Sequence, residues 1–483
     1  MHLKAKKALF WLIVDVLGGQ AIPFAAFLVM ARIISPGEYG AFALAMSFVG
    51  LLNIVLYQGL ADALIRVETT DDKMLATAFW MNMALAVLIA AAVQLSAGWM
   101  AELYRAPALA SALRWLSLLA PLQALVSVHV ALFRRHLETA VLARRTFVGR
   151  VVGAVAGIGL ALAGWGIWSL VALQIVQAAV STAILWTASS WFPQIAFSWR
   201  HCKDLVRFGS HFMGGSIATA LGTTVDSLIV GLFFDPKSVG CYVLASRLLD
   251  MASTVLLVPM RQLVMPVLSR AAGKPREFMA SYESMVMPAF VVWMPLLVLL
   301  GAGAEFLIPT LFGQRWADAV GVLQAMSLTA FTTPLWFFVG QAMAATGRPE
   351  VYMRLAGVQM VLTSICVALG SLHSLTGVGV GWTVSSALMV PVSLSAMRRI
   401  CGFECGEILR HASKLSVAGL VLLAGSIGVA HGEELLAIDS WITLALGGLV
   451  GVGLYLGLIE YVLIPGEIST GLRGVRELVS PAK

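Results

Sequence analysis

Four aspartates and four arginines lie within or at the ends of long apolar stretches of this sequence. They are Asp15, Asp62, Asp226, Asp250, Arg32, Arg66, Arg247 and Arg261. An ionisable side chain inside an apolar segment is costly to place, so such residues usually take part in binding or in proton transfer. A desolvated carboxylate can titrate and thereby couple protonation to a conformational change. A guanidinium presents a rigid fork of hydrogen-bond donors to an anion.

Asp226 and Arg247 fall at similar depths on two consecutive predicted helices. Each is about eight residues from the turn between those helices, which places both about 12 Å below one membrane surface at 1.5 Å per residue. Asp250 follows Arg247 by three residues and so shares nearly the same helical face, while Arg261 lies deeper. The spacing allows Asp226 and Arg247 to pair, either as a functional couple or as a salt bridge that only neutralises two buried charges.

The charges in the N-terminal part differ in how easily they reach water. Asp15 lies about two turns inside the first apolar stretch, where its short side chain cannot reach the membrane surface. Asp62 closes the second stretch. Arg32 and Arg66 lie near span ends, where snorkelling of a long basic side chain to the interface is the simpler interpretation.

The elements that hold these residues are membrane-spanning helices. Hydrophobic residues make up 59% of the chain and charged residues 12%, against a charged share of about 25% in soluble domains. Runs of about 20 apolar residues, enough to cross a bilayer as a helix, recur along the whole chain. The predicted spans centre near Ala21, Leu51, Val87, Pro121, Ala156, Ala178, Ala220, Ser253, Leu297, Phe331, Leu362, Ser386, Val421 and Gly451. The sequence predicts an all-α polytopic membrane protein with about fourteen spans and no extramembrane enzymatic domain.

Basic residues indicate the orientation of these spans. Most of the 32 lysines and arginines fall in alternate connections if the N-terminus is cytoplasmic, as expected for cytoplasmic loops. Both termini are therefore predicted to be cytoplasmic. The net charge of +7 reflects this topology and contact with anionic membrane lipids, and it gives no reason to expect a nucleic-acid partner.

One turn sequence occurs twice in the chain. The segment ISPGEYGAFALA, residues 34–45, returns as DPKSVGCYVLA, residues 235–245, so that Pro36 matches Pro236 and Gly40 matches Gly240 at a spacing of 200 residues. Proline and glycine are common in turns, so convergence is the alternative; the shared Leu-Ala pair and equal position in each half favour duplication. Six spans separate the copies, and this even number predicts a parallel repeat.

This repeat defines the predicted domains: an N-lobe at 1–188, a cytoplasmic linker at 189–206, a C-lobe at 207–400, and two further helices with a tail at 401–483. The first-lobe positions equivalent to Asp226 and Arg247 are Ala26 and Ser47, so the lobes share a scaffold but not its charges. Two such lobes describe a transporter that binds its substrate between the repeats. The linker mixes aromatic and basic residues and is predicted to lie on the inner membrane surface.

Polar uncharged and cysteine residues add little specific chemistry. The glutamines inside spans either bind sugar hydroxyls or, more simply, hold helices together; they are Gln20, Gln123, Gln174, Gln177, Gln324, Gln341 and Gln359. The five cysteines are scattered, and CGFEC at 401–405 has neither redox CxxC spacing nor nearby zinc ligands. We predict no cofactor and no metal site.

Two hairpins carry a resemblance to a known family. The segment ARIISPGEYGAFALAMSFVGLLNIVLYQGLADALIR, residues 31–66, and the segment TTVDSLIVGLFFDPKSVGCYVLASRLLD, residues 223–250, resemble the polysaccharide transporter family. These are the Wzx-type O-antigen and exopolysaccharide flippases of the multidrug/oligosaccharidyl-lipid/polysaccharide superfamily. The resemblance implies a substrate, a polyprenyl diphosphate-linked oligosaccharide moved from the cytoplasmic to the periplasmic leaflet of a bacterial inner membrane.

The resemblance gives the intramembrane charges expected roles. Arg247 and Arg261, together with Arg32 or Arg66, are expected to attract the diphosphate, because arginine matches phosphate oxygens. Asp226 and Asp250 would hold the arginines when the site is empty. Asp15 is the first candidate for coupling to a proton or sodium gradient. A polysaccharide polymerase and a chain-length regulator are expected partners.

Three alternatives remain open at this stage. A multidrug exporter of the same superfamily would share the lobes but normally has twelve spans and an acidic cavity. The lipid II flippase of peptidoglycan synthesis is nearer, with fourteen spans and a cationic cavity. A membrane polymerase or ligase would need a large periplasmic loop with catalytic residues, and the longest outer loops here are short.

Overall fold

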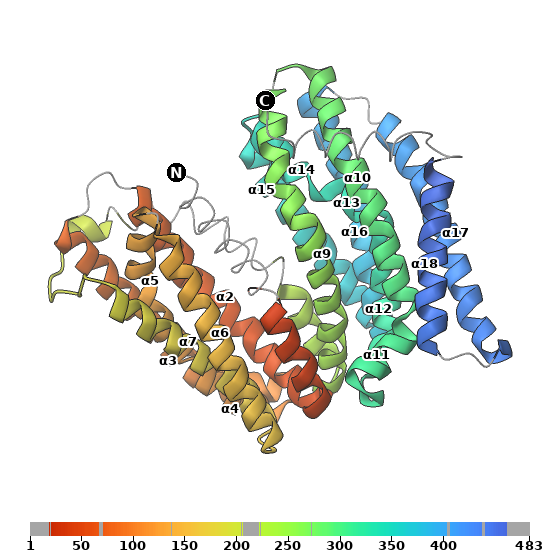
Figure 1. Cartoon of the computed structure of the whole chain (residues 1–483). Helices are drawn as coiled ribbons and strands as arrows, with labels where there is room; N and C mark the ends of the chain where they lie inside the picture. Colours follow the sequence, from red (N-terminus) through yellow and green to blue (C-terminus); the bar gives the residue numbers. More distant parts are fainter. Residues whose placement is uncertain are drawn as a thin grey trace. The chain divides into compact units, whose positions relative to one another are not determined.

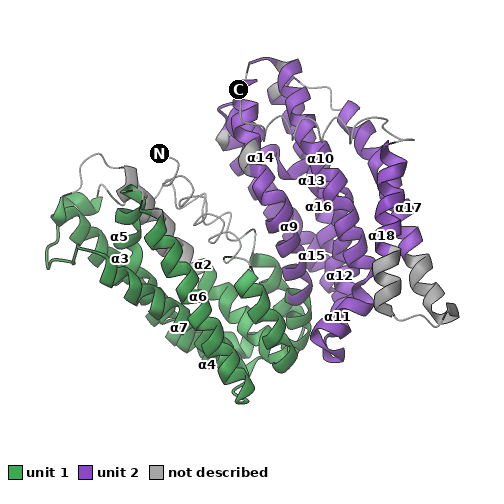
Figure 2. Ribbon diagram, in the orientation of Figure 1, with its two compact units in different colours: residues 1–243 green, residues 244–483 purple. Residues whose placement is uncertain are grey.

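Helices make up most of the part of the chain that the computed structural model describes, and no strand occurs in that part. The structure describes residues 19, 21–66, 71–136, 138–203, 205, 222, 224–271, 273–402, 406–436 and 440–460, without the side chains at 52–66, 139, 262–263, 275, 349, 401 and 427–447. The chain forms two compact units, Met1–Val243 and Leu244–Lys483, and the boundary between them falls within one long helix (Figures 1 and 2). The lobe boundaries predicted from the sequence stay a prediction.

Unit 1 is a group of long apolar helices. Its elements are a short helix at Ala21–Ile33, α2 (Pro36–Arg66), α3 (Asp72–Leu103), α4 (Pro107–Leu116), α5 (Leu119–Arg135), α6 (Thr139–Leu162), α7 (Ile167–Ala188), a short helix at Thr224–Phe233 and the beginning of α9 (Pro236–Arg270). Asp71 caps α3, since its Oδ1 accepts a hydrogen bond of 2.8 Å from the N–H of Met74. Such a cap satisfies an N–H group that has no partner within the helix.

Unit 2 continues α9 and adds a set of helices that includes one broken span. The further elements are α10 (Pro275–Ala302), α11 (Ala304–Phe312), η1 (Gln314–Trp316), α12 (Ala319–Ser327), η2 (Leu328–Phe331), α13 (Thr333–Phe337), α14 (Val339–Ala345), α15 (Pro349–Ser371), α16 (Leu375–Cys401), α17 (Gly406–Leu436) and α18 (Ser440–Leu458). Ser374 caps α16 by accepting from the N–H of Gly377 at 2.9 Å. Gly402 ends it in the left-handed conformation, with φ of 73°, which glycine adopts without steric cost.

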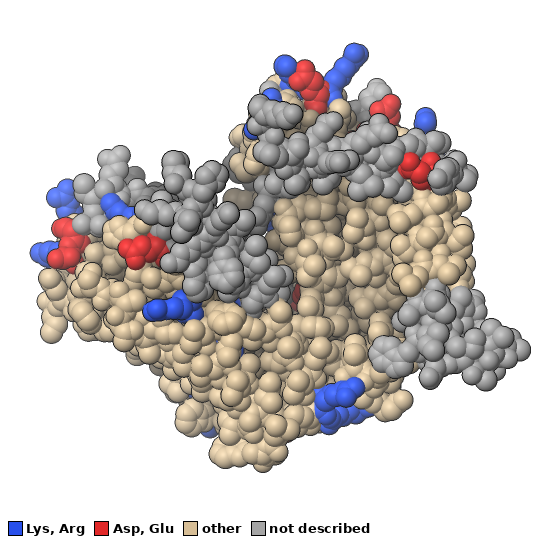
Figure 3. Space-filling view, in the orientation of Figure 1, with Lys and Arg blue, Asp and Glu red and all other residues tan. Residues whose placement is uncertain are grey.

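The predicted all-α membrane fold is confirmed. Within the described residues, nine helices are long and apolar enough to cross a membrane, and a bent pair, Ala319–Phe331 with Thr333–Ala345, makes up to ten. Thirteen of the fourteen predicted span centres fall within described helices, two of them in the shorter apolar helices Ala21–Ile33 and Gly448–Leu458. The other centre, Ala220, lies outside the described residues. On the visible face of unit 2, charged side chains gather near the top of the view, and a broad uncharged surface lies below them (Figure 3).

The broken span bends by 60° at Thr332. Pro334 lies in the first turn of α13, after the bend, where its missing N–H and fixed φ are suited to a helix start rather than to a helix interior. Within a membrane, backbone groups released by such a break need partners from neighbouring protein. The bend is therefore a place in unit 2 where polar partners for the backbone are needed.

Small residues allow α6 and α7 to lie in close contact. Gly149, Gly153 and Gly157 recur once per turn on α6. A Cβ atom added to Gly153 would lie 2.8 Å from both the Leu173 carbonyl oxygen and the Gln177 Cβ of α7. Because membrane helices associate through close van der Waals packing, this glycine series sets the distance between the two helices.

We expect Gly153→Val to lower the free energy of unfolding by about 1–3 kcal/mol, the usual cost of forcing extra atoms into a packed contact. Gly159→Val, on the same helix, is the matched control, because no atom lies within 4 Å of the added Cβ. Thermal unfolding of the detergent-purified protein measures both. Equal midpoints for the two variants would show that the glycine series does not determine α6–α7 packing.

Candidate functional site

The two copies of the repeated turn have the same backbone hydrogen bonds at a spacing of 200 residues. The N–H of Ile34 donates to the Met30 carbonyl at 2.8 Å, and the N–H of Phe234 donates to the Val230 carbonyl at 2.9 Å. Each of these bonds closes the helix before the turn. The backbone thus reverses at the same residue in both copies.

Both following helices are capped at the same position by different side chains. Ser35 Oγ accepts from the N–H of Glu38 at 3.3 Å, and Glu38 Oε2 accepts from the N–H of Ser35 at 3.2 Å, forming a reciprocal capping box. In the second copy Asp235 Oδ1 accepts from the N–H of Ser238 at 3.0 Å. The sequence changed between the copies while the capping function was kept.

The two turns lie against each other within unit 1, and each glycine faces the backbone of the other copy. A Cβ added to Gly40 would overlap the carbonyl oxygen of Pro236, and one added to Gly240 would overlap that of Pro36. The added atom at Gly40 would also lie 2.7 Å from the Gly240 nitrogen. The contact is therefore reciprocal, as in a two-fold interface.

Asp226 is a buried acid in the short helix Thr224–Phe233, which precedes the second copy of the turn. It is 8% exposed, and its Oδ2 accepts a hydrogen bond of 2.7 Å from the Tyr242 hydroxyl, two residues beyond Gly240. Its Oδ1 accepts from the N–H of Ser227 at 2.8 Å. A buried carboxylate needs such donors, because leaving its lone pairs unpaired is costly.

Arg247 and Asp250 are exposed on α9 in unit 2. Their spacing of three residues keeps them on nearly the same helical face. Asp226 belongs to unit 1 and Arg247 to unit 2, and the predicted pairing of these two side chains stays a prediction.

Arg261 lies at the broken span of unit 2. Its guanidinium carbon is 5.7 Å from the ring centroid of Phe337 on α13. With the Gln341 amide oriented so that its oxygen faces α9, that oxygen accepts from Arg261 Nε and, at 3.0 Å, from Nη2. A cation over an aromatic ring and a side-chain amide acceptor together fix the guanidinium.

Hydroxyl groups also gather at the bend. Thr332 Oγ1 and Ser386 Oγ are 2.7 Å apart, and the indole N–H of Trp336 donates to Ser386 Oγ at 3.0 Å. Sequence reasoning did not assign Thr332, Ser386 or Phe337 to a site. The Thr-Thr-Pro sequence at 332–334, inside an apolar stretch, was the available signal for a break.

Among the other predicted residues, Arg32 has a described side chain, and Asp15, Asp62 and Arg66 do not. Arg32 is exposed and lies near the C-terminal end of the short helix Ala21–Ile33. Asp15 lies outside the described residues. Asp62 and Arg66 belong to α2, and their side chains lie outside the described part of the structure.

Solved structures place this fold among known transporters. The structure titled lipid II flippase MurJ, inward closed conformation, is similar with a TM-score of 0.74 and 14% identity, covering 99% of this chain and 100% of that one. An inward-facing multidrug resistance MATE family transporter of the MOP superfamily is similar with a TM-score of 0.65 and 14% identity, covering 82% of this chain and 98% of that one. The chain thus shares the fold of these two solved structures.

A family model defines the family of this chain. The chain belongs to the family described as "Polysaccharide biosynthesis protein", whose model matches residues 29–321, and the predicted resemblance is confirmed. The succinoglycan biosynthesis transport protein ExoT of Rhizobium meliloti is 28% identical over 396 residues, covering 79% of this chain and 80% of ExoT. The teichuronic acid biosynthesis protein TuaB of Bacillus subtilis is 23% identical, covering 62% of each chain. The lipopolysaccharide biosynthesis protein WzxC of Escherichia coli is 20% identical, covering 67% of this chain and 66% of WzxC.

We expect Gly40→Ala and Gly240→Ala each to destabilise unit 1 by about 1–3 kcal/mol, because the added methyl group meets backbone that cannot rotate away. Gly37→Ala, in the first copy of the turn, is the control, since its added Cβ has no atom within 4 Å. Thermal unfolding of the purified protein measures the three variants. A Gly40→Ala protein as stable as Gly37→Ala would refute the reciprocal backbone contact.

A double-mutant cycle tests the Asp226–Tyr242 hydrogen bond. We expect Tyr242→Phe to lower the free energy of unfolding by about 1–3 kcal/mol, because it leaves a buried carboxylate with one donor fewer. In an Asp226→Ala background the same substitution should have a much smaller effect. Additive effects of the two substitutions would contradict the bond.

Proposed function

We propose that this protein is a flippase for polyprenyl diphosphate-linked oligosaccharides, moving them from the cytoplasmic to the periplasmic leaflet for assembly of a surface polysaccharide. Membership in the polysaccharide biosynthesis family carries the proposal. The MOP-type transporter fold supports it. The proposed activity is transport and not catalysis.

The diphosphate is the part of this substrate that needs the protein. A compact anion cannot cross about 30 Å of hydrocarbon alone. Protein groups must replace water as its hydrogen-bond donors. Arg261 has five N–H groups, of which two go to Gln341, so three are left for an anion. We propose that Arg261 and Arg247 bind the diphosphate, with Arg32 and Arg66 near the ends of its route, while the prenyl chain stays in lipid.

The aspartates would serve the transport cycle. Asp226 and Asp250 are proposed to hold arginines when no substrate is bound. Asp15 is proposed to couple transport to a proton or sodium gradient, since a desolvated carboxylate can take up a proton. A chain with both termini cytoplasmic would place the repeated turns on the periplasmic side, where the Gly40–Gly240 contact would close unit 1 at that end.

The lipid II flippase function is the second candidate. It is favoured by the similarity to the MurJ structure over nearly the whole of both chains. Its substrate also carries a polyprenyl diphosphate, so the same arginines would serve. The two functions differ in the attached glycan and therefore in which polymer is lost without the protein.

Deletion of the gene tests the function directly. Lipid-linked oligosaccharides are extracted and their leaflet is assayed, beside surface polysaccharide and peptidoglycan. We expect accumulation on the cytoplasmic side, loss of surface polysaccharide and normal peptidoglycan. Arrested peptidoglycan synthesis would identify the lipid II function. Unchanged polymers with altered sensitivity to cationic drugs would identify a drug exporter and refute both proposals.

Arginine variants test the proposed site in the complemented deletion strain. We expect Arg261→Gln and Arg247→Glu to reduce surface polysaccharide at least tenfold, because each removes charge-assisted donors worth about 1.5–3 kcal/mol. Arg261→Lys should retain part of the activity, since it keeps the charge but not the fork.

Arg348→Gln is the control, an exposed cation at the N-terminus of α15 outside the proposed site. Membrane levels of every variant are matched by immunoblot. Normal export by Arg247→Glu or Arg261→Gln would remove that residue from the proposed site.

A further inference from the structure

The segment after α7 is fixed to the side of unit 1. The chain at 189–203 has no regular structure up to Ser198 and lies against the first turns of α3. Trp80 Nε1 donates to the Gln194 carbonyl at 2.9 Å, and the N–H of Ser198 donates to Thr77 Oγ1 at 3.1 Å. Two hydrogen bonds to the same helix thus determine which side of this segment faces outward.

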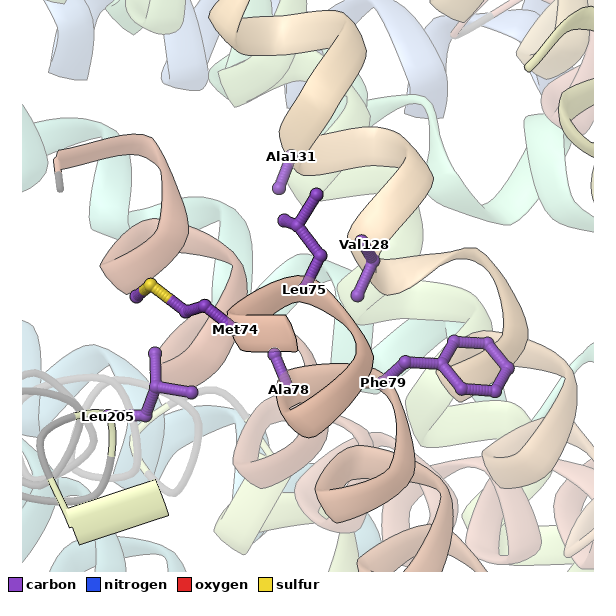
Figure 4. Packing of buried hydrophobic residues seen from close by; sticks show 7 residues of the cluster. All are labelled: Met74, Leu75, Ala78, Phe79, Val128, Ala131 and Leu205. Atoms are coloured by element: carbon purple, nitrogen blue, oxygen red, sulfur yellow. The ribbon is translucent and has the colours of Figure 1, made fainter. Parts of the chain in front are cut away.

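Apolar packing holds the inner side of the segment. The ring of Trp191 lies 6.2 Å from that of Phe79 and 5.5 Å from that of His129, between centroids. Farther along, Leu205 is 2% exposed in a cluster with Met74, Leu75, Ala78, Phe79, Val128 and Ala131. Figure 4 shows Leu205 beside Met74 of α3, with Val128 and Ala131 of α5 on the other side of the cluster.

The outer side of the same segment is apolar and uncovered within unit 1. Ile195 is 98% exposed and Trp199 is 73% exposed, and Phe192 and Phe197 are also exposed. Four large apolar side chains on one short segment form a patch that a water-facing loop would not keep.

An open recess lies within this patch. It has a volume of about 300 Å³ and is lined by Trp80, Ile195, Ala196 and Phe197. Its lining is almost entirely apolar. A recess of this size accommodates part of a hydrocarbon chain and offers nothing to a polar ligand.

Two cations follow the patch directly. The chain becomes helical at Trp199, and the N–H of Cys202 donates to the Ser198 carbonyl at 2.9 Å. Arg200 and Lys203 are both exposed and are three residues apart on this turn, which places them on one side of it. Aromatic and apolar residues beside cations are the composition of segments that lie in the membrane interface.

We propose that the segment 191–203 is a binding site for an anionic phospholipid. An acyl chain lies in the recess of Trp80, Ile195 and Phe197, and the phosphate contacts Arg200 and Lys203. The charge complementarity selects a phospholipid of negative charge over a zwitterionic one. The site shares no residue with the proposed transport route and does not depend on the proposed function.

The test uses the purified full-length protein in nanodiscs of equimolar phosphatidylcholine and phosphatidylglycerol. Native mass spectrometry after release into detergent measures which lipid stays bound. We expect preferential retention of phosphatidylglycerol. Arg200→Gln with Lys203→Gln should weaken this retention about fivefold per cation, corresponding to about 1 kcal/mol for each.

Arg114→Gln is the matched control, an exposed cation next to the exposed Trp115 on α4 of the same unit. It should retain phosphatidylglycerol like the wild type. Because all three side chains point outward, the variants should fold, and thermal unfolding midpoints check this. Equal retention by the double variant and the control would overturn the proposal.

A second pair of variants tests the recess. Ile195→Ser with Phe197→Ser should reduce retention of phosphatidylglycerol, while Val155→Ser with Leu162→Ser, exposed apolar residues of α6, should not. Adding the lipid-linked oligosaccharide as competitor distinguishes the ligand. Displacement of phosphatidylglycerol from Arg200 and Lys203 by that substrate would assign the segment to substrate capture and overturn the phospholipid proposal.

Discussion

Every backbone amide in hydrocarbon must find its hydrogen-bond partner within the protein. This requirement explains why the described chain is helical and why its departures from helix are so informative. The bend at Thr332 releases backbone groups in the middle of an apolar stretch. Hydroxyls of Thr332 and Ser386, the indole of Trp336 and, farther along, the Arg261–Gln341 contact are found around it. Polar chemistry is concentrated where the helix cannot supply its own partners.

The repeated turn separates what the fold requires from what the proposed function requires. Backbone hydrogen bonds of the repeated turn recur at the same spacing, and both copies cap the following helix, although one uses Ser35 and the other Asp235. The buried Asp226 has only Ala26 at the matching position. The geometry of the turn is thus the same in both copies, while the buried carboxylate is present only at the position of the second copy. A charge-specific task therefore requires only one copy to change.

Much of the fold could be predicted from the sequence, and the site could be predicted only in part. Long apolar runs identify spans because length and hydropathy are local properties, and every predicted centre except Ala220 lies in a described helix. The Gly40–Pro236 contact involves residues far apart in the chain, and the repeated turn indicated duplication but not mutual packing. Arg261 was recognised from its charge, yet its partners Phe337 and Gln341 could not be, because they lie beyond a helix break whose angle depends on tertiary packing.

The reciprocal glycine contact also constrains how the two halves of the gene can evolve. Each glycine packs against the prolyl carbonyl of the other copy, so a larger side chain in one half cannot be accommodated by a change within that half alone. Room would have to come from the backbone of the other repeat. Two segments that carry the same turn, and whose neighbouring loops and charges differ, are therefore bound to the same residue type at this one position. Recombination that replaced one half of the gene with that of a distant homologue would be tolerated only where the incoming turn also has glycine at this position.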